Sequence, residues 1–257
     1  MNNAKKFLFN ALICLTSILS ALGLASCNFS AFNAPAEIVL YFILNDSQDA
    51  YAVKPVFHAE EGPLLGLPIP VDVVIPAKHK GLPVTSVTEE AFAYHSDLIS
   101  VKIPDSITLI GEKAFFRCSN LTKITVDENN LHYKSIDGNL YTKDGKTLVQ
   151  YAIGKEATAF TVPDSVTAIA PYAFAACNHL TSVVLPNSVE FIGAYAFNYC
   201  NSLKSISFIH TTSDWYRTHD ATDWKNKTNG TKTDVANASD NVTYFLDSYY
   251  DYYWYKV

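Results

Sequence analysis

Charged residues are scarce in this chain: Asp, Glu, Lys and Arg make up only 17% of its 257 residues. Low charge combined with 49% hydrophobic residues argues against a disordered chain. The 19 Lys and Arg residues form no basic cluster of the kind that binds nucleic acid. No Gly-x-Ser-x-Gly, His-Glu-x-x-His or phosphate-loop motif occurs. The composition therefore favours one folded domain without a recognisable catalytic motif or cofactor site.

The first 26 residues have the plan of a secretory signal peptide. Lys5 and Lys6 precede an apolar run over residues 7–22, and the stretch Leu24-Ala25-Ser26-Cys27 follows. This ending resembles the lipobox of bacterial lipoproteins, which implies cleavage after residue 26 and lipidation of Cys27. Acyl chains on Cys27 would attach the protein to a membrane. An uncleaved anchor helix, or an ordinary signal peptide with a chance cysteine, is the alternative.

The residues after the leader are expected to form a tether and then a cap. Residues 27–36 are mostly small and polar, which suits a tether. Within residues 37–70, two strand-like stretches at 37–45 and 51–53 flank turn residues, and residues 62–70 are rich in Pro, Gly and Leu. We therefore expect a hairpin and a loop that cover the open end of a repeat array.

One phrase recurs along the chain at a fixed period. Residues 98–120 align with residues 180–202 at a constant offset of 82, so that Gly111 matches Gly193. Four Ala-Phe pairs show the period. Successive pairs are separated by 23, 59 and 23 residues, and 59 is one repeat of 23 plus an insert of 36. The pairs are Ala91-Phe92, Ala114-Phe115, Ala173-Phe174 and Ala196-Phe197. Such a period is typical of a solenoid, so residues 71–208 are expected to stack as six rungs.

Each rung is expected to supply one short strand and one helical turn. Val101 and Ile103 alternate with polar residues, which predicts a strand with one buried face, and Pro104 ends it. Phe115 and Cys118 follow at a spacing that suits a helical turn. Stacked rungs would form an α/β solenoid with parallel strands on the concave face and helical turns on the convex side. The strands are expected near residues 71–75, 99–103, 122–126, 158–162, 181–185 and 204–208.

Two further segments interrupt or follow the repeats. Residues 127–157 contain two strand-like stretches around the turn Lys143-Asp144-Gly145-Lys146, which predicts a β-hairpin that protrudes between the third and fourth rungs. Residues 209–257 are polar at first and end in a tyrosine-dense stretch. This tail is expected to cap the last rung, although an exposed aromatic patch would have the same composition.

The repeated phrase resembles the BspA-type leucine-rich repeat of bacterial and protist surface proteins. The resemblance covers about residues 37–208, and the insert resembles a hairpin common in that family. The matching residues are Ile103-Pro104-Asp105-Ser106, Ile110-Gly111, Ala114-Phe115, Cys118 and Leu121; Val162-Pro163-Asp164-Ser165, Ala173-Phe174 and Cys177; and Leu185-Pro186-Asn187-Ser188, Ala196-Phe197 and Cys200. His95 and Ala157 depart from the pattern, at the positions of the Cys and of the leading Leu. The lipobox and the tyrosine-rich tail further resemble lipoproteins of spirochaetes.

The resemblance implies a non-catalytic leucine-rich-repeat lipoprotein that binds protein or glycan partners in adhesion, either to a host or between cells. We expect it to be exported and held through Cys27 at the outer membrane, facing outward, with no nucleic-acid partner. A structural lipoprotein of the periplasm or envelope, without an external ligand, is the alternative. An enzyme would need a clustered acid–base pair, and the repeats offer none.

If the solenoid binds a partner, the outward positions of its strands and the hairpin insert are the candidate surface. Most of these strand positions are small, so a partner's backbone could approach closely; an ordinary solvated sheet face would have the same composition. The positions are Asp72, Val74, Ser100, Lys102, Lys123, Thr125, Ala159, Thr161, Ser182, Val184, Ser205 and Ser207.

Cysteine and histidine suggest little chemistry. The cysteines of three repeats share one position, which favours a column of small buried residues, although a disulfide between Cys177 and Cys200 would suit an oxidising compartment. A group of His and Asp residues near the tail favours a solvated loop over a metal site. Its members are His210, Asp214, His219, Asp220 and Asp223.

Overall fold

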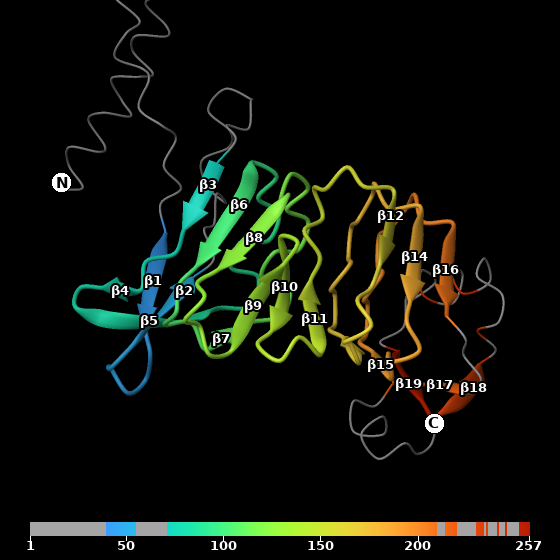
Figure 1. The fold of residues 1–257 in the computed structure, drawn as a ribbon. Helices are drawn as coiled ribbons and strands as arrows, with labels where there is room; N and C mark the ends of the chain where they lie inside the picture. Colours follow the sequence, from blue (N-terminus) through green and yellow to red (C-terminus); the bar gives the residue numbers. More distant parts are fainter. Residues whose placement is uncertain are drawn as a thin grey trace, which may run out of the picture. The chain divides into compact units, whose positions relative to one another are not determined.

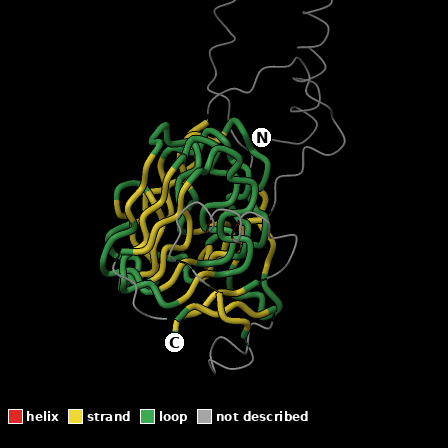
Figure 2. Tube along the Cα trace, turned by 90° about the vertical axis from the view of Figure 1, so that its right-hand side faces the viewer, coloured by secondary structure: helices red, strands yellow, loops and turns green. Residues whose placement is uncertain are grey.

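The computed structural model describes residues 40–54, 71–209, 214–219, 230–233, 235, 241, 245 and 252–257. The chain separates into two compact units, Met1–Ala36 and Glu37–Val257. The expected signal peptide, the tether and Cys27 lie outside the described residues, as does the loop expected at residues 62–70. All described residues belong to the second unit, which is built almost entirely of strands and turns (Figures 1 and 2).

One strand from each rung contributes to a first ladder of hydrogen bonds. Neighbouring strands run parallel with an offset of one repeat, so that Val101 pairs with Ile124 and Val183 with Ile206. The strands are β3 (Val71–Val74), β6 (Leu98–Ile103), β8 (Lys123–Val126), β12 (Ala159–Thr161), β14 (Ser182–Leu185) and β16 (Ser205–Phe208). The predicted solenoid of parallel strands is thus confirmed. Its strands form two sheets of three, because the insert comes between β8 and β12.

A second ladder, which the sequence analysis missed, runs along another side of the rungs. It consists of parallel strands, three of which have only two residues, and Val87 pairs with Ile110 in its first part. The strands are β5 (Leu82–Val87), β7 (Leu109–Ile110), β11 (Thr147–Gln150), β13 (Ala168–Ile169) and β15 (Phe191–Ile192). The motif serine lies just before these strands: the Ser106 hydroxyl donates a hydrogen bond of 2.7 Å to the Val84 carbonyl of the preceding rung.

The convex side is formed by turns, and the helical turns expected there are absent from the described rungs. Residues 89–94 and 112–117 each contain two residues with left-handed backbone, four positions apart. A right-handed α-helix does not accommodate such residues. Alternate amides bond to the next rung instead of within a helix: Phe92 N–H donates to the Ala114 carbonyl at 2.8 Å, and Phe174 N–H to the Ala196 carbonyl at 2.8 Å. The turns therefore form a third ladder between rungs.

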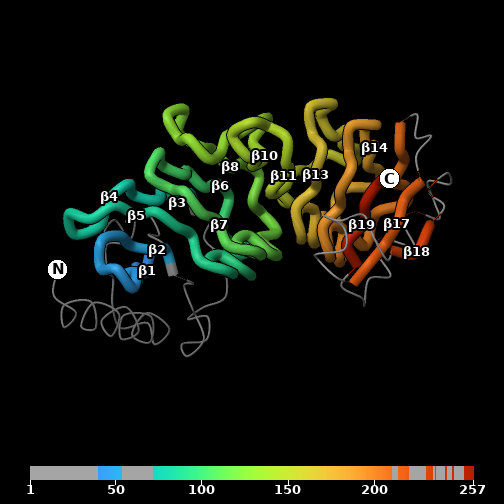
Figure 3. The backbone as a smooth tube through the Cα atoms, turned by 90° about the horizontal axis from the view of Figure 1, so that it is seen from below, coloured from blue at the N-terminus to red at the C-terminus, as the bar shows by residue number. Residues whose placement is uncertain are grey.

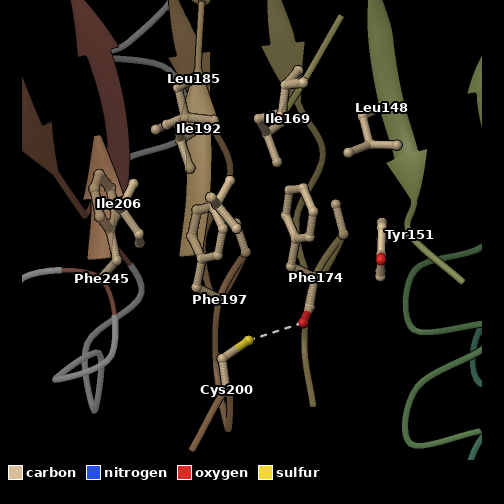
Figure 4. Packing of buried hydrophobic residues seen from close by; sticks show 14 of the residues in the cluster. Leu148, Tyr151, Ile169, Phe174, Leu185, Ile192, Phe197, Cys200, Ile206 and Phe245 are labelled. Carbon is tan, nitrogen blue, oxygen red and sulfur yellow. Dashed lines mark hydrogen bonds between the residues drawn. The ribbon is translucent and has the colours of Figure 1, made fainter. Parts of the chain in front are cut away.

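Aromatic rings stack along the interior. Phe92 and Phe115 are stacked with centroids 5.6 Å apart, and in the second half Tyr151, Phe174 and Phe197 form a further stack (Figure 4). Aliphatic side chains from the ladders, among them Leu148, Ile169 and Ile192, cover these rings and are fully buried. The phenylalanines of the Ala-Phe pairs thus lie in the interior in two stacks, one before the insert and one after it.

The insert lies within the stack of rungs and does not protrude. Its strands are β9 (Tyr133–Ile136), β10 (Asn139–Thr142) and the already described β11, and β9–β10 and β10–β11 pair as hairpins. Tyr141 and Leu148 are buried. Tyr151 N–H donates to the Ala173 carbonyl of the following rung at 2.8 Å, just as Phe92 N–H donates to the Ala114 carbonyl. Residues 147–154, which begin with β11, thus act as an additional partial rung (Figure 3). Tyr151 supplies the ring that packs against Phe174 on that side (Figure 4).

Additional strands lie at both ends of the repeats. At the N-terminal end, β1 (Tyr41–Leu44) and β2 (Tyr51–Lys54) form a hairpin that joins β5, with β4 (Lys78–His79) on the other side of β5. At the C-terminal end, β19 (Tyr253–Lys256) pairs with β15 and with β17 (Trp215–Thr218), which pairs with β18 (Thr231–Thr233). Trp254 and Trp215 are buried there, so the described part of the tail covers the last rung.

Candidate functional site

The twelve outward positions of the first ladder form two panels. In the first panel, the pairing of β3, β6 and β8 aligns Asp72 with Ser100 and Lys123, and Val74 with Lys102 and Thr125. In the second panel, the pairing of β12, β14 and β16 aligns Ala159 with Ser182 and Ser205, and Thr161 with Val184 and Ser207. All twelve side chains are exposed or half-buried. The structure therefore assembles the whole candidate face, in two parts.

The two panels differ in charge. The first panel carries the exposed ammonium groups of Lys102 and Lys123 beside Asp72, whose carboxylate accepts a 2.6 Å hydrogen bond from the Ser100 hydroxyl. It also exposes 63% of the apolar Val74 side chain. The second panel has no charged residue and is mostly hydroxyls and small apolar groups. A partner would meet ionic groups on the first panel and a nearly flat, neutral surface on the second.

The insert adjoins the first panel. Ile124 N–H on β8 donates to the Gly138 carbonyl at 2.8 Å, and the Ser135 hydroxyl donates to the Ile124 carbonyl at 2.8 Å. These bonds occupy part of the β8 edge, which would otherwise be free to pair with another strand. The insert therefore extends the first panel, as the hypothesis of a combined sheet and hairpin surface requires.

A buried asparagine, which the sequence analysis missed, fixes the start of the insert. The Asn130 amide donates to the carbonyls of Pro104 and Ile107 at 2.8 and 2.9 Å. Its oxygen accepts the backbone N–H groups of His132 and Tyr133, each at 2.8 Å. The available signal was the turn-forming sequence from Asp127 to Asn130, where Asn and Asp side chains bond to nearby backbone.

The cysteine thiols are buried and suited to packing. Burial raises the pKa of the Cys118 thiol far above its ordinary value, and that thiol donates to the Phe92 carbonyl at 2.8 Å. The pKa of Cys177 is also raised; burial is the largest cause, and the neighbouring Cys200 is the next. The thiols of Cys118, Cys177 and Cys200 are free, so the structure contains no disulfide between the last two. None of the three has the exposure of a reactive nucleophile.

The described residues offer little room for a small-molecule reaction. A hollow of about 100 Å³ lies beside Gly111 and Pro171, and its ionisable lining residues are Glu112 and Lys113. Ligand pockets usually enclose about 300–1,000 Å³. Within the described part of the chain, no three His, Cys, Asp or Glu residues could share a metal ion, and no helix is long and apolar enough to cross a membrane. Of the suspected His and Asp group, His210, Asp220 and Asp223 lie outside the described residues, and Asp214 pairs with Lys232 at 2.6 Å.

A family model described as the BspA type leucine rich repeat region matches six copies over residues 80–145 and 150–218. The matched residues make up more than half of the chain. The chain belongs to the BspA-type leucine-rich repeat family. This repeat family is typical of bacterial surface proteins. The predicted family is thereby confirmed, and the rungs described above are its repeats.

Several solved structures of leucine-rich repeat proteins are similar to this chain. The pneumococcal vaccine antigen PcpA is 27% identical to this chain, with a TM-score of 0.46. The match covers 50% of this chain and 32% of the antigen, so this chain spans about a third of the antigen's length. A leucine-rich repeat protein of T. pallidum is 27% identical with a TM-score of 0.40, covering 65% of this chain and 67% of that one. A leucine-rich cell surface protein of Faecalibacterium prausnitzii is 20% identical with a TM-score of 0.38, covering 68% and 78%. No curated protein sequence matches the chain.

Proposed function

We propose that this BspA-type repeat protein is a non-catalytic adhesin, a lipoprotein that binds a protein or glycan partner at the bacterial surface. The observation that carries the proposal is the alignment of twelve outward side chains into two accessible panels across six rungs. A regular, open array of this kind suits an extended partner. The hypothesis of an enzyme has little support, since the hollow beside Gly111 is small and burial makes the thiols of Cys118 and Cys177 hard to ionise.

The panels suggest how contact would be made. The side chains of Ser182 and Ser205 are short, so a partner's backbone can approach the second panel closely. Lys102 and Lys123 on the first panel would attract an acidic group and add ionic specificity. Both panels are held by backbone ladders, so their backbone is already ordered before binding.

The membrane attachment is a separate part of the proposal. Lipidation of Cys27 would anchor the protein, and residues 28–36 would let the repeats stand off the membrane. Labelling cells with an alkyne-bearing palmitate analogue should tag the wild-type protein and leave the Cys27→Ala variant untagged. Protease treatment of intact cells should degrade the protein if it faces outward. Full protection would contradict surface display and favour a structural role in the periplasm.

Binding is tested with the purified full chain against immobilised matrix proteins and a glycan array. Ser182→Arg with Ser205→Arg places two bulky side chains on the second panel, and Lys102→Glu with Lys123→Glu reverses the charge of the first. We expect at least one double variant to weaken binding about tenfold or more, since interface energy is concentrated in few contacts. Ser47→Arg, at an exposed residue of the turn between β1 and β2, is the matched control. Equal binding by all variants, with unchanged circular dichroism, would rule out the panels as the site.

A further inference from the structure

An aromatic surface lies away from the two panels, on the turns of the rungs. We name it the tyrosine surface, and its members share outward positions on turns that are hydrogen-bonded between rungs. Its residues are Tyr94, Phe116, Arg117, Tyr172, Tyr195 and Tyr199. Tyr94 is 63% exposed and Tyr199 is 49% exposed, which is high for rings of this size. Neither the repeat motif nor the packing of the core requires aromatic residues at these positions.

The rings of the tyrosine surface form one continuous cluster. The Phe116 ring lies 5.6 Å from Tyr94, 6.1 Å from Tyr172 and 6.2 Å from Tyr199, measured between centroids. Tyr172 is in turn stacked on Tyr195 at 5.1 Å. The cluster therefore joins residues from before and after the insert.

Small residues explain how rings from distant rungs can meet. Ala152 follows Tyr151 and Ala175 follows Phe174, as Phe116 follows Phe115, so that alanines hold the equivalent position in the next two rungs. Both alanines are buried. Larger side chains at these positions would compete with the rings for the same space.

The backbone at five members of the surface makes their side chains notable. Left-handed backbone, with φ between 57° and 66°, occurs at Tyr94, Arg117, Tyr172, Tyr195 and Tyr199. Glycine and asparagine adopt this conformation readily, whereas it is unfavourable for a bulky side chain. Tyrosine at four such positions is therefore poorly explained by backbone geometry. Bulky residues in an unfavourable backbone conformation on an accessible surface are typical of a functional site.

Arg117 gives the surface its charge. Its guanidinium lies 4.3 Å from the centroid of the Tyr199 ring and 5.7 Å from that of Tyr94. Within the described part of the chain, Arg117 forms no ion pair and no hydrogen bond, and its side chain is exposed. By contrast, Lys113 on the same turn already pairs with Glu90 at 3.3 Å. Arg117 thus presents fixed, planar donors that match a carboxylate.

We propose that the tyrosine surface is a second binding site, which takes a protein segment that brings a carboxylate to Arg117 and apolar side chains to the surrounding rings. Tyrosine and arginine are the residues most enriched at the energetic centres of protein interfaces. The ring arrangement favours a protein over a sugar. Tyr94 meets Phe116 edge-on at 89°, and Arg117 covers Tyr199, so fewer ring faces are open for a sugar to stack on. This inference rests on the proposed binding function and assigns part of it to a different face.

The test uses the full chain, purified in detergent, on an array of synthetic peptides. Each peptide carries one Glu flanked by Leu, Phe or Tyr, and each has a twin with Gln in place of Glu; anionic glycans are printed beside them. We expect Glu peptides to bind about tenfold more tightly than their Gln twins, the scale of one charge-assisted hydrogen-bonded pair. Arg117→Gln should remove this preference, and Tyr199→Asn should weaken binding of both twins.

Two controls separate binding from folding. Lys78→Gln removes an exposed charge from β4, which belongs neither to the panels nor to the tyrosine surface, and should leave peptide binding unchanged. Tyr94→Asn replaces a bulky left-handed residue with one that tolerates the conformation, so its melting temperature should equal or exceed that of the wild type while peptide binding weakens. A clearly lower melting temperature for Tyr94→Asn than for the wild type would instead assign Tyr94 a packing role.

The outcomes distinguish this inference from the proposed function. It is overturned if no peptide binds, if the twins bind equally, if Arg117→Gln keeps the preference, or if anionic glycans bind through Arg117 and peptides do not. If only the panel variants abolish adhesion, the proposed function stands and the tyrosine surface is not the site. If peptides bind through Arg117 while no matrix protein adheres to the panels, the tyrosine surface stands and the panels are not the site.

Discussion

The Phe174 and Phe197 rings are stacked with centroids 4.9 Å apart and planes 6° from parallel, although one full repeat of chain separates them. The Cys200 thiol, three residues after Phe197, donates to the Phe174 carbonyl at 3.0 Å (Figure 4). One repeat therefore brings a ring and a thiol onto the ring and the carbonyl of the repeat before it. This contact shows why the repeats must stack: each leaves one face of its phenylalanine for the next to cover.

Close approach of the rungs should make the motif glycines irreplaceable. A Cβ on Gly193 would lie 2.4 Å from the Pro171 nitrogen, and one on Gly111 would lie 2.4 Å from the Glu89 nitrogen. Neither glycine has a left-handed backbone, so alanine would otherwise be stabilising by about 0.4–1 kcal/mol. Because the clash is with backbone, we expect Gly193→Ala and Gly111→Ala each to cost about 1–3 kcal/mol in urea unfolding. An unchanged or raised midpoint in either variant would contradict this packing.

Asn130 should be a main support of the insert. Replacing it with Ala removes four hydrogen bonds, among them the bond to the carbonyl of buried Ile107 and the bonds from the His132 and Tyr133 amides. We expect a loss on the order of 3 kcal/mol in the free energy of unfolding. The adjacent Asn129 is exposed, and Asn129→Ala should cost less than about 1 kcal/mol. Similar effects of the two variants would show that Asn130 does not hold the insert in place.

The buried thiols should resist modification. Because burial raises the pKa of Cys118 and Cys177, raising the pH from 7 to 9 should not make either reactive in the folded protein. Mass spectrometry after brief treatment with a maleimide should find no label on Cys118, Cys177 or Cys200 until denaturant is added. Reductant should leave the melting temperature unchanged, since these thiols are free. A reductant-sensitive melting temperature would instead indicate that Cys177 and Cys200 pair.

The hairpin turn of the insert should respond to acid. Hydrogen bonds from the Lys146 N–H, at 2.9 Å, and from the Thr142 hydroxyl, at 2.7 Å, hold the pKa of Asp144 below its ordinary value of 3.8. A carboxyl with a lowered pKa contributes stability above its unfolded pKa and loses it as pH falls through the folded pKa. The melting-temperature gap between the wild type and Asp144→Asn should therefore be present at pH 6 and shrink below pH 3.8. A gap independent of pH would contradict these bonds.

The first ladder could be predicted because its physical cause is visible in the sequence. Alternation such as Val101 and Ile103 around Lys102 has one structural solution, a strand with one buried face, and the repeat period fixes its neighbours. The same alternation identified the twelve outward positions.

The convex side could not be predicted in the same way. Phe115 and Cys118 have a spacing that fits a helical turn and also a turn with two left-handed residues, and both conformations bury the same side chains. Only the amide pairing to the next rung decides between them, and no single repeat carries that information. The second ladder was missed because two-residue strands such as β7 show no alternation.

Two signals were present and went unused. Tyr151 lies one repeat period before Phe174, which marks the end of the insert as part of a rung. Tyr172 and Tyr195 are also one repeat period apart, which indicates a stacked pair on the turn side. In both cases tyrosine at the repeat period was the clue.

The most direct test of stacked repeats is a double-mutant cycle on Phe174 and Phe197, with Phe92 and Phe197 as the distant control pair. Each residue is changed to Leu, singly and in pairs, and the free energy of unfolding is measured in urea. The account predicts a coupling of about 0.5–1.5 kcal/mol between Phe174 and Phe197. For Phe92 and Phe197, the two substitutions should add to within about 0.5 kcal/mol. Equal coupling in both pairs, or none in the first, would contradict the stack.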